Sequence, residues 1–423
     1  MNNKDNSLTN NRFGKYGWLM ILFALVCYYF WAATGTDGLN VYPAAFSEAH
    51  GWDYNLLLGF ATPAGLIGLI GGVIFGSLVM KWKVRKVAFV CLVITGALYI
   101  LFPFSVSPLM YLACLTGFTF FGNGFGLVCT ATLMANWFPR KKGIALGWAT
   151  MGAPLCTATF VTLLSVLVAT KGLKAAFVIV GAVIVVIGFL ALVWVKNYPE
   201  EVGAYPDNIP TEKSSEELLA EEDSYVSPYT IGKLVKDKDF WFISLGFGLL
   251  WLVTVGIVSQ FVARMMSVGH DQGTALMYLT VASVVGIAGS YFWGWLDQKI
   301  GTKPATIVYS ASYIIALIFL ILQLNTFTTY IAIIFVGLGI GGLLNLMPSL
   351  VISVYGRYDF AAVNRLVSPL ASLVMKFAFV IMAVLLAASG GSYTLPYIIF
   401  IFIDVAGAVL IMLVTNKCKG KVD

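Results

Sequence analysis

Twelve long apolar stretches run along the chain, and one polar segment near residue 200 separates the first six from the last six. Each is long enough to cross a bilayer, which takes about 20 predominantly apolar residues, and lipid forces each to satisfy its own backbone polar groups as a helix. The stretches predict an all-α membrane protein of twelve transmembrane helices in two six-helix, pseudo-symmetric halves. They cover residues 17–45, 54–80, 87–104, 108–137, 143–169, 175–195, 239–263, 274–296, 304–323, 328–354, 366–389 and 394–415.

The polar segment defines the expected domain organisation. We predict an N-terminal half over 1–196, a linker over 197–238 and a C-terminal half over 239–423. The linker is interrupted by prolines and contains an acidic run from Glu216 to Asp223. Charge runs of this kind are usually solvated, so we expect this one to be a solvated face.

Composition and charge distribution support this organisation and add an orientation. The chain is 59% hydrophobic and 11% charged, against roughly 25% charged residues in soluble domains. Alternating spans place 22 of the 26 lysines and arginines on one side of the membrane together with both termini. Because positive loops stay cytoplasmic, we expect a multi-pass protein of the cytoplasmic membrane with both termini inside. The +6 net charge is spread over all these loops, so the expected partner is the lipid bilayer and not nucleic acid.

Two loops, each following the second span of its half, carry a related pattern. The first reads GSLVMKWKVRK from Gly76 to Lys86, and the second reads GWLDQKIGTK from Gly294 to Lys303. Both resemble the loop signature of the major facilitator superfamily, which implies a twelve-helix transporter fold whose loops take part in gating. The expected gating residues are Lys83, Arg85, Arg140, Lys141, Asp297 and Lys303.

The same loops depart from the signature. Met80 stands where the family has aspartate, Lys83 where it has glycine, and Asp297 lies one position early. The family's acidic latch is therefore in doubt here. The basic residues are expected instead to bind the negative C-terminal ends of helices or anionic lipid heads.

A narrower resemblance joins four short motifs. Asn136 to Gly147 (NWFPRKKGIALG), the linker's Pro199 to Gly203 (PEEVG), Asp239 to Trp241 (DFW) and Phe292 to Gly294 (FWG) are similar to the oxalate/formate antiporter and monocarboxylate transporter group. This resemblance implies transport of a small organic anion.

Lys376 is one of three ionisable residues deep inside the spans. A charge at the bilayer centre costs at least about 2.5 kcal/mol, so each of the three should face a partner or a wet cavity. The resembling antiporters carry a substrate-binding lysine in the eleventh helix, which implies that Lys376 binds the substrate carboxylate. The alternative is a buried structural pair with Asp404, because counting residues at about 1.5 Å each places the two at similar depth.

Asp37 lies between two glycines in the outer part of the first span. Glycines can unwind a helix locally, and broken segments at depth usually line cavities. Asp37 could then carry a proton or neutralise Lys376 in the empty state. The alternative is that the helix ends early and Asp37 is simply solvated.

Ser290 bears on substrate size. The oxalate carriers have an arginine at this position, just before Phe-Trp-Gly, which gives a dicarboxylate its second positive contact. With serine here, a monocarboxylate is favoured over oxalate. Around Lys376 we expect a cavity of aromatic and polar side chains, although aromatics are also common at membrane interfaces. The candidates are Tyr28, Trp31, Thr34, Asn123, Trp148, Gln260, Ser290, Tyr291 and Asn345.

These features predict a secondary active transporter that moves a small organic anion, a monocarboxylate, by alternating access with proton coupling or anion exchange. No Gly-x-x-x-x-Gly-Lys-Ser/Thr loop occurs in the sequence, so the energy should come from a gradient. The alternative is a drug or neutral-solute efflux transporter of the same superfamily. Two scattered histidines argue against an enzyme, and we expect no catalytic residue, no cofactor and no metal. The protein is expected to act as a monomer.

Overall fold

The computed structural model describes residues 10–322 and 325–421, which form helices and contain no strand. Gln323, the last residue of the predicted ninth span, lies outside this part. Ten helical stretches are long and apolar enough to cross a membrane. Two helices, α5 (Ala61–Leu101) and α17 (Leu343–Ala388), are interrupted by left-handed residues, Lys83 with φ 64° and Gly356 with φ 73°. Each interruption separates two passes, so the structure confirms the predicted twelve-helix fold.

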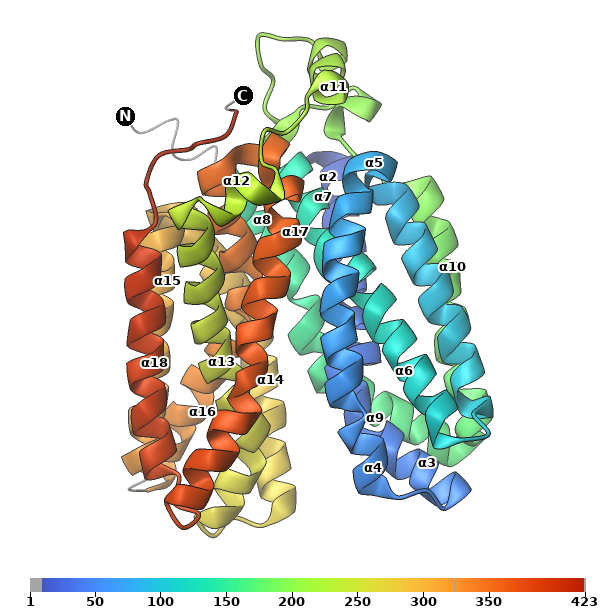
Figure 1. Cartoon of the computed structure of the whole chain (residues 1–423), viewed down its shortest axis with the longest axis vertical. Helices are drawn as coiled ribbons and strands as arrows, with labels where there is room; N and C mark the ends of the chain where they lie inside the picture. The colour runs from blue at the N-terminus through green and yellow to red at the C-terminus, as the bar shows by residue number, and fades with distance from the viewer. Residues whose placement is uncertain (1–9, 323–324, 422–423) are drawn as a thin grey trace.

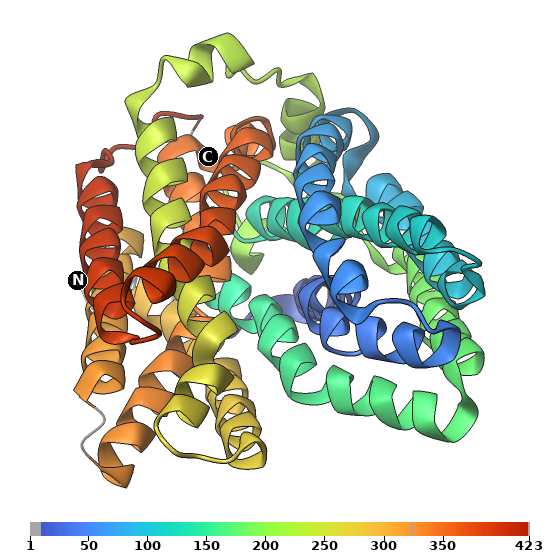
Figure 2. The ribbon, with the colours of Figure 1, turned by 60° about the horizontal axis from the view of Figure 1, so that its bottom comes forward.

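The first six passes form one bundle, coloured blue to green in Figures 1 and 2. Besides α5, the bundle contains α2 (Gly14–Ala32), α3 (Tyr42–His50), α4 (Tyr54–Gly59), α6 (Pro108–Asn123), α7 (Thr130–Trp137), α8 (Lys142–Thr150), α9 (Gly152–Lys171) and α10 (Leu173–Trp194). Short π or 3₁₀ turns join them at Ala33–Asp37, Gly38–Asn40, Phe102–Phe104 and Gly124–Cys129.

The last six passes form the second bundle, in which the part of α17 before Gly356 completes the tenth pass begun by α16. Its helices are α13 (Lys238–Ser267), α14 (Gln272–Ile300), α15 (Thr302–Leu322), α16 (Thr326–Ile340), α17 and α18 (Thr394–Leu413). The linker contains 3₁₀ turns at Pro199–Val202 and Pro206–Asn208 and two short helices, α11 (Ser215–Ser224) and α12 (Ile231–Val235).

The first pass is broken where the sequence predicts unwinding. After α2 the chain makes a π-helical turn in which Gly35 has φ −96° and ψ −108°, outside the helical region. The hydroxyl of Tyr42 donates to the carbonyl of Ala33 at 2.8 Å and so satisfies a polar group beside the break. The predicted span 17–45 is therefore not one continuous helix, although the unwinding beside Asp37 is confirmed.

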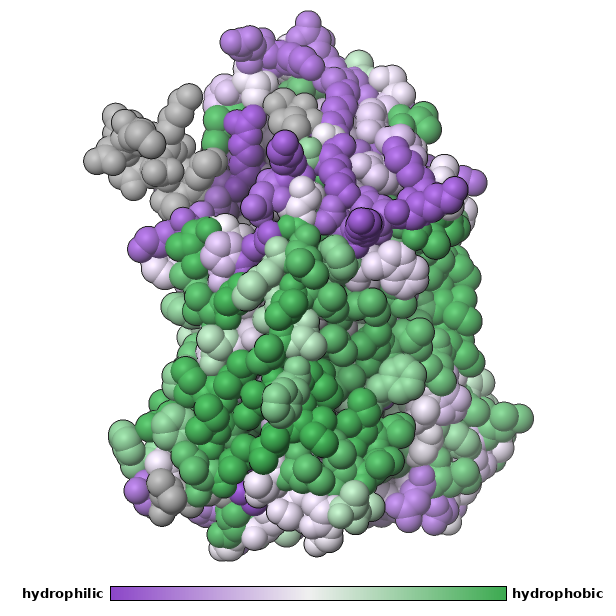
Figure 3. Space-filling model, turned by 60° about the vertical axis from the view of Figure 1, so that its left-hand side comes forward, coloured by the Kyte–Doolittle hydropathy of each residue, from purple (hydrophilic) through white to green (hydrophobic). Residues whose placement is uncertain are grey.

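Both described ends of the chain and the linker lie at one end of the molecule, which we call the terminal face, and the opposite end is the far face (Figure 1). On the side of the molecule shown in Figure 3, hydrophobic side chains cover a broad middle belt, and hydrophilic ones gather at the terminal face. This belt fits a bilayer between the two faces. In Figure 1 the bundles come together near the terminal face and diverge toward the far face.

Glycines allow the bundles to approach closely near the terminal face. In α5, Gly76 lies against Arg365 of α17, and a methyl group at Gly72 would lie 3.1 Å from the ring of Pro369. In α8, a methyl group at Gly143 would lie 2.6 Å from the carbonyl oxygen of Gly294 in α14. Small residues at both crossings therefore bring the helix backbones together.

Candidate functional site

Lys376 lies in the second pass of α17 and reaches across to α5 of the other bundle. A methyl group built on Gly65 would lie 2.7 Å from Lys376 Nζ, so the ammonium group rests against the backbone of α5. The residue is partly exposed. Within residues 10–322 and 325–421, no carboxylate lies within 4.0 Å of this nitrogen. The structure thus places the Lys376 ammonium group between the two bundles with no counter-ion among the described residues.

A polar network of the first bundle lies one helical turn away from this ammonium group. The indole nitrogen of Trp31 donates to Asn123 Oδ1 at 3.1 Å, and Asn123 Nδ2 donates to the carbonyl of Gly68 at 2.7 Å. Gly68 and Gly65 lie on the same side of α5. Two predicted cavity residues, Trp31 and Asn123, therefore lie near Lys376. The hydroxyl of Thr34 bonds to the carbonyl of Phe30 at 2.8 Å.

Asp37 is buried at the break of the first pass, with 7% of its surface exposed. Thr157 of α9 donates its hydroxyl to the carboxylate, 3.1 Å from Oδ2. The interpretation that Asp37 is simply solvated is therefore wrong. In this conformation Asp37 also makes no ion pair with Lys376, since no carboxylate of the described chain lies within 4.0 Å of that lysine.

Asp404 lies inside the second bundle. Its Oδ2 accepts a hydrogen bond from Ser310 of α15, and its buried Oδ1 has no hydrogen-bond partner in the described part of the chain. The predicted alternative, a buried pair with Lys376, is not formed in this conformation.

Ser290 and Asn345 belong to a tightly packed helix crossing. Asn345 Nδ2 donates to the carbonyl of Ser290 at 2.8 Å, and Ser290 is fully buried. Methyl groups at Gly147 and Gly341 would lie 3.1 Å from its carbonyl oxygen and 2.5 Å from its hydroxyl oxygen, respectively. Neither polar side chain faces open space here.

Three other predicted cavity residues lie at the two ends of the molecule. The rings of Trp148 and Tyr291 are 5.0 Å apart, and both are hydrogen-bonded to Asn11 beside the terminal face, at 3.3 and 3.5 Å. Gln260, in the last part of α13 toward the far face, accepts from Tyr393 at 3.4 Å. The structure therefore divides the predicted cavity and does not bring these residues to Lys376.

Side chains of the two bundles come together between Lys376 and the terminal face. Tyr28 of the first bundle and Asn364 and Ser368 of the second line a cavity of about 10 Å³. A single water molecule needs roughly 10–15 Å³ by the same kind of measure. This small volume and the close glycine crossings of the two bundles indicate that this conformation is closed on its terminal face.

Some of the predicted gating residues join helix ends and loops within one bundle. Lys303 Nζ bonds to the carbonyl of Val414, just after α18, at 2.5 Å, which confirms that a basic loop residue binds a helix C-terminus. Asp297 is buried and accepts hydroxyl hydrogen bonds from Thr302 and Ser349 at 2.7 and 2.5 Å.

The remaining predicted gating residues hold the linker and the N-terminal segment. Asn197 accepts from the backbone N–H of Arg85 at 2.9 Å. Asp207 accepts from the backbone N–H groups of Arg140 and Lys141, 3.1 and 2.7 Å from Oδ1, and burial raises the pKa of its carboxyl to about 6. The Lys141 ammonium group bonds to the carbonyl of Arg12 at 3.2 Å, while burial lowers its pKa.

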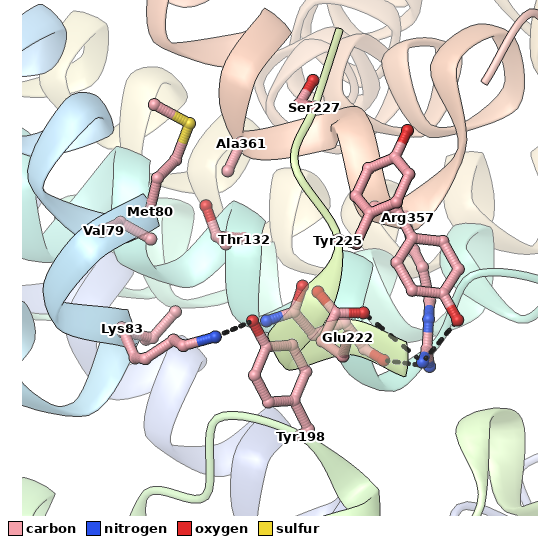
Figure 4. Close-up of a pocket in the computed structure, with 13 residues that line it drawn as sticks. Val79, Met80, Lys83, Thr132, Tyr198, Glu222, Tyr225, Ser227, Arg357 and Ala361 are labelled. Atoms are coloured by element: carbon pink, nitrogen blue, oxygen red, sulfur yellow. Dashed lines mark hydrogen bonds and ion pairs between the residues drawn. The ribbon is translucent and has the colours of Figure 1, made fainter. Parts of the chain in front are cut away.

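A charge cluster at the terminal face was missed by the sequence analysis. Arg357, after the tenth pass, pairs with Glu200 at 2.9 Å. It also pairs with Glu222 at 3.6 Å (Figure 4). Lys83 pairs with Asp223 at 3.2 Å. The expectation that the acidic run of the linker is a solvated face is therefore wrong for Glu222, whose side chain is only 11% exposed. One indication of this cluster was present in the sequence, because the predicted topology placed the acids of the linker and the bases of both halves on the same side of the membrane.

Comparison with known proteins establishes the family. The model of the Major Facilitator Superfamily matches residues 20–375. The chain therefore belongs to this superfamily of membrane transporters, whose fold carries out transport and not catalysis.

Individual relatives are distant. The chain is 24% identical to an uncharacterized MFS-type transporter, YhjX, of Escherichia coli K12, over 70% of this chain and 71% of that one. It is 26% identical to the oxalate:formate antiporter of Oxalobacter formigenes over 48% of this chain and 46% of that protein. In structure it is similar to the proton:xylose symporter XylE bound to 6-bromo-6-deoxy-D-glucose. That match has a TM-score of 0.74 and 13% identity, and it covers 98% of this chain and 97% of that one. This last similarity shows the fold alone.

Proposed function

We propose that this chain is a secondary active transporter that moves a small organic anion, a monocarboxylate, by alternating access. The observation that carries the proposal is the Lys376 ammonium group, which lies between the bundles without a counter-ion within 4.0 Å in the described residues. An uncompensated charge at this depth is costly. A carboxylate entering from the far face would neutralise it in a low-dielectric environment, where the attraction is much stronger than in water.

Two further observations support this cargo. One relative is an antiporter named for two small carboxylates, oxalate and formate. Ser290, where the resembling oxalate carriers have arginine, is fully buried between glycines at a helix crossing. That position offers no second cation, which favours one carboxylate over two.

The proposal includes a topology and a coupling residue. We place the terminal face in the cytoplasm and the protein in the cytoplasmic membrane, because the lysines and arginines concentrate at that face. We assign proton coupling to Asp37, which is buried beside a backbone break and whose carboxylate accepts a hydrogen bond from the hydroxyl of Thr157. Exchange of one anion for another remains the competing form of coupling.

The test is anion binding by purified protein. Formate, acetate and lactate should raise the melting temperature of the wild-type chain by mass action, and Lys376→Gln should remove that shift. Lys174→Gln, which removes an exposed lysine near the far face, is the matched control and should keep it. Equal anion shifts in Lys376→Gln and wild type would refute the role of Lys376. Shifts produced only by neutral solutes or hydrophobic cations would favour the efflux alternative.

A further inference from the structure

Glu222 belongs to a buried cluster that joins both bundles through the linker. The cavity beside it has a volume of about 100 Å³ and is lined by Val79, Lys83 and Asn136 of the first bundle and by Arg357 and Ala361 of the second. Glu222 itself comes from the linker helix α11. Opening the terminal face would have to separate these walls and admit water to the carboxyl group.

Two carboxylates share the guanidinium of Arg357. Its guanidinium contacts two carboxylates, at 2.9 Å in Glu200 and 3.6 Å in Glu222, and the nearer carboxylate and the guanidinium are each about 1% exposed. One guanidinium can neutralise one carboxylate, and two ionised carboxylates at one buried site repel each other. Glu222 Oε2 has no hydrogen-bond partner in the described part of the chain. Glu200 Oε2 likewise has none among the described residues. Glu222 lies farther from the guanidinium than Glu200, at 3.6 against 2.9 Å, so it is the acid that the cation stabilises less and that gains more from a proton.

Charged and titratable groups from α17, α5 and the linker face Glu222. They include Arg357 and Tyr358 from α17, Lys83 from α5, Glu200 from the first 3₁₀ turn of the linker, and the phenols of Tyr198 and Tyr225. Lys421 of the C-terminal segment lies over the rings of Tyr225 and Tyr358. Burial outweighs the attraction of Arg357 and Lys83 and raises the pKa of Glu222 to about 7.

We propose that Glu222 is a proton-binding site which exists only while the terminal face is closed, so that closure takes up a proton and opening releases it. This regulatory site goes beyond the proposed function, because it would act on any cargo. The sign follows from linkage. The closed state binds the proton more tightly than an open state in which Glu222 is in water. Closure is therefore favoured at low pH, and opening becomes easier as the pH rises through about 7.

The test is thiol labelling at the terminal face without any substrate. Val79→Cys places a buried reporter in the cavity wall, with Cys418→Ser removing the exposed native thiol. Its labelling rate with N-ethylmaleimide is measured from pH 6 to 8 in chains with and without Glu222→Gln. The labelling rate of the chain with Glu222 is divided by that of the Glu222→Gln chain at each pH, which cancels the intrinsic pH dependence of the thiol. We expect this ratio to rise about tenfold, as linkage requires when a carboxyl with a pKa near 7 becomes solvated on opening.

Glu216→Gln, which removes an exposed acid of the same helix, is the control and should reproduce the wild-type profile. A ratio that stays constant between pH 6 and 8 would overturn the proposal. So would a chain in which Glu200→Gln abolishes the pH dependence while Glu222→Gln leaves it intact. Should Glu222→Gln fail to fold, hydrogen exchange of residues 215–224 in the unsubstituted chain gives the same answer, since protection corrected for intrinsic exchange should fall from pH 6 to 8. None of these results depends on the identity of the anion.

Discussion

At the scale of single residues, the ionisable side chains of Lys376 and Asp404 lie in different surroundings. Asp404 is hydrogen-bonded to Ser310 inside the second bundle, whereas Lys376 lies against Gly65 of the first. The two charges should therefore act independently. We predict that Lys376→Gln abolishes anion binding and that Asp404→Asn leaves it within a few-fold of wild type, with additive effects on melting temperature in the double variant.

A structural pair would behave differently. Breaking a buried pair leaves an uncompensated charge and costs about 3–5 kcal/mol, and neutralising both partners restores stability. A double variant that is more stable than either single variant and still binds anions would contradict the roles assigned here.

Ser290 carries the prediction about selectivity. Its surroundings leave no room for an arginine, since methyl groups at Gly147 and Gly341 would already crowd it. We predict that formate or lactate competes for transport at least tenfold better than oxalate, because the second carboxylate would find no cation and would be buried unpaired. Competition assays with labelled substrate measure this, and equal inhibition by oxalate would count against a monocarboxylate site.

The sequence could give the depth of these charges but not the direction in which they point. Counting residues along a helix gives depth because the rise is constant. It does not show which neighbour a side chain faces, which is why Lys376 and Asp404 looked like a possible pair. The same limit applies to Trp148 and Tyr291, whose contact with Asn11 depends on how the N-terminal segment folds back.

At the scale of helices, apolar length predicted the passes well, because the bilayer fixes how much chain is needed. The break at Gly35 was also predictable from the glycines beside Asp37. Burial of Glu222 was not, because it depends on Arg357, which lies 135 positions further along the chain. Local composition carries no information about such a partner.

The crossing of α8 and α14 gives a prediction at this scale. Gly294 lies against the backbone of Gly143, and an added side chain has no room without a backbone shift. Overpacking of this kind costs typically about 1–3 kcal/mol. We predict that Gly294→Val lowers the melting temperature and makes the Val79→Cys reporter easier to label, because the closed terminal face is strained. Gly232→Val is the control, since a side chain there meets open space; similar effects in both variants would contradict the argument.

At the scale of the whole molecule, the contacts explain why this conformation is closed on one side. The glycine crossings, the cavity of about 10 Å³ and the linker ion pairs all lie between Lys376 and the terminal face. The bundles diverge toward the far face (Figure 1). A transporter in this state would receive its cargo from the far face and release it after the linker contacts break.

Which compartment each face meets follows from the distribution of charge. Lysines and arginines gather at the terminal face, so we predict that this face is cytoplasmic. In a Cys418→Ser background, Glu212→Cys in the linker should react with a membrane-impermeant maleimide only after cells are permeabilised. Val106→Cys, 86% exposed in the loop after α5 at the far face, should react in intact cells. These positions lie on opposite sides of the hydrophobic belt, so reaction of both in intact cells would refute either the orientation or the number of passes between them. Reaction of Glu212→Cys alone in intact cells would show that the orientation is the reverse of the predicted one.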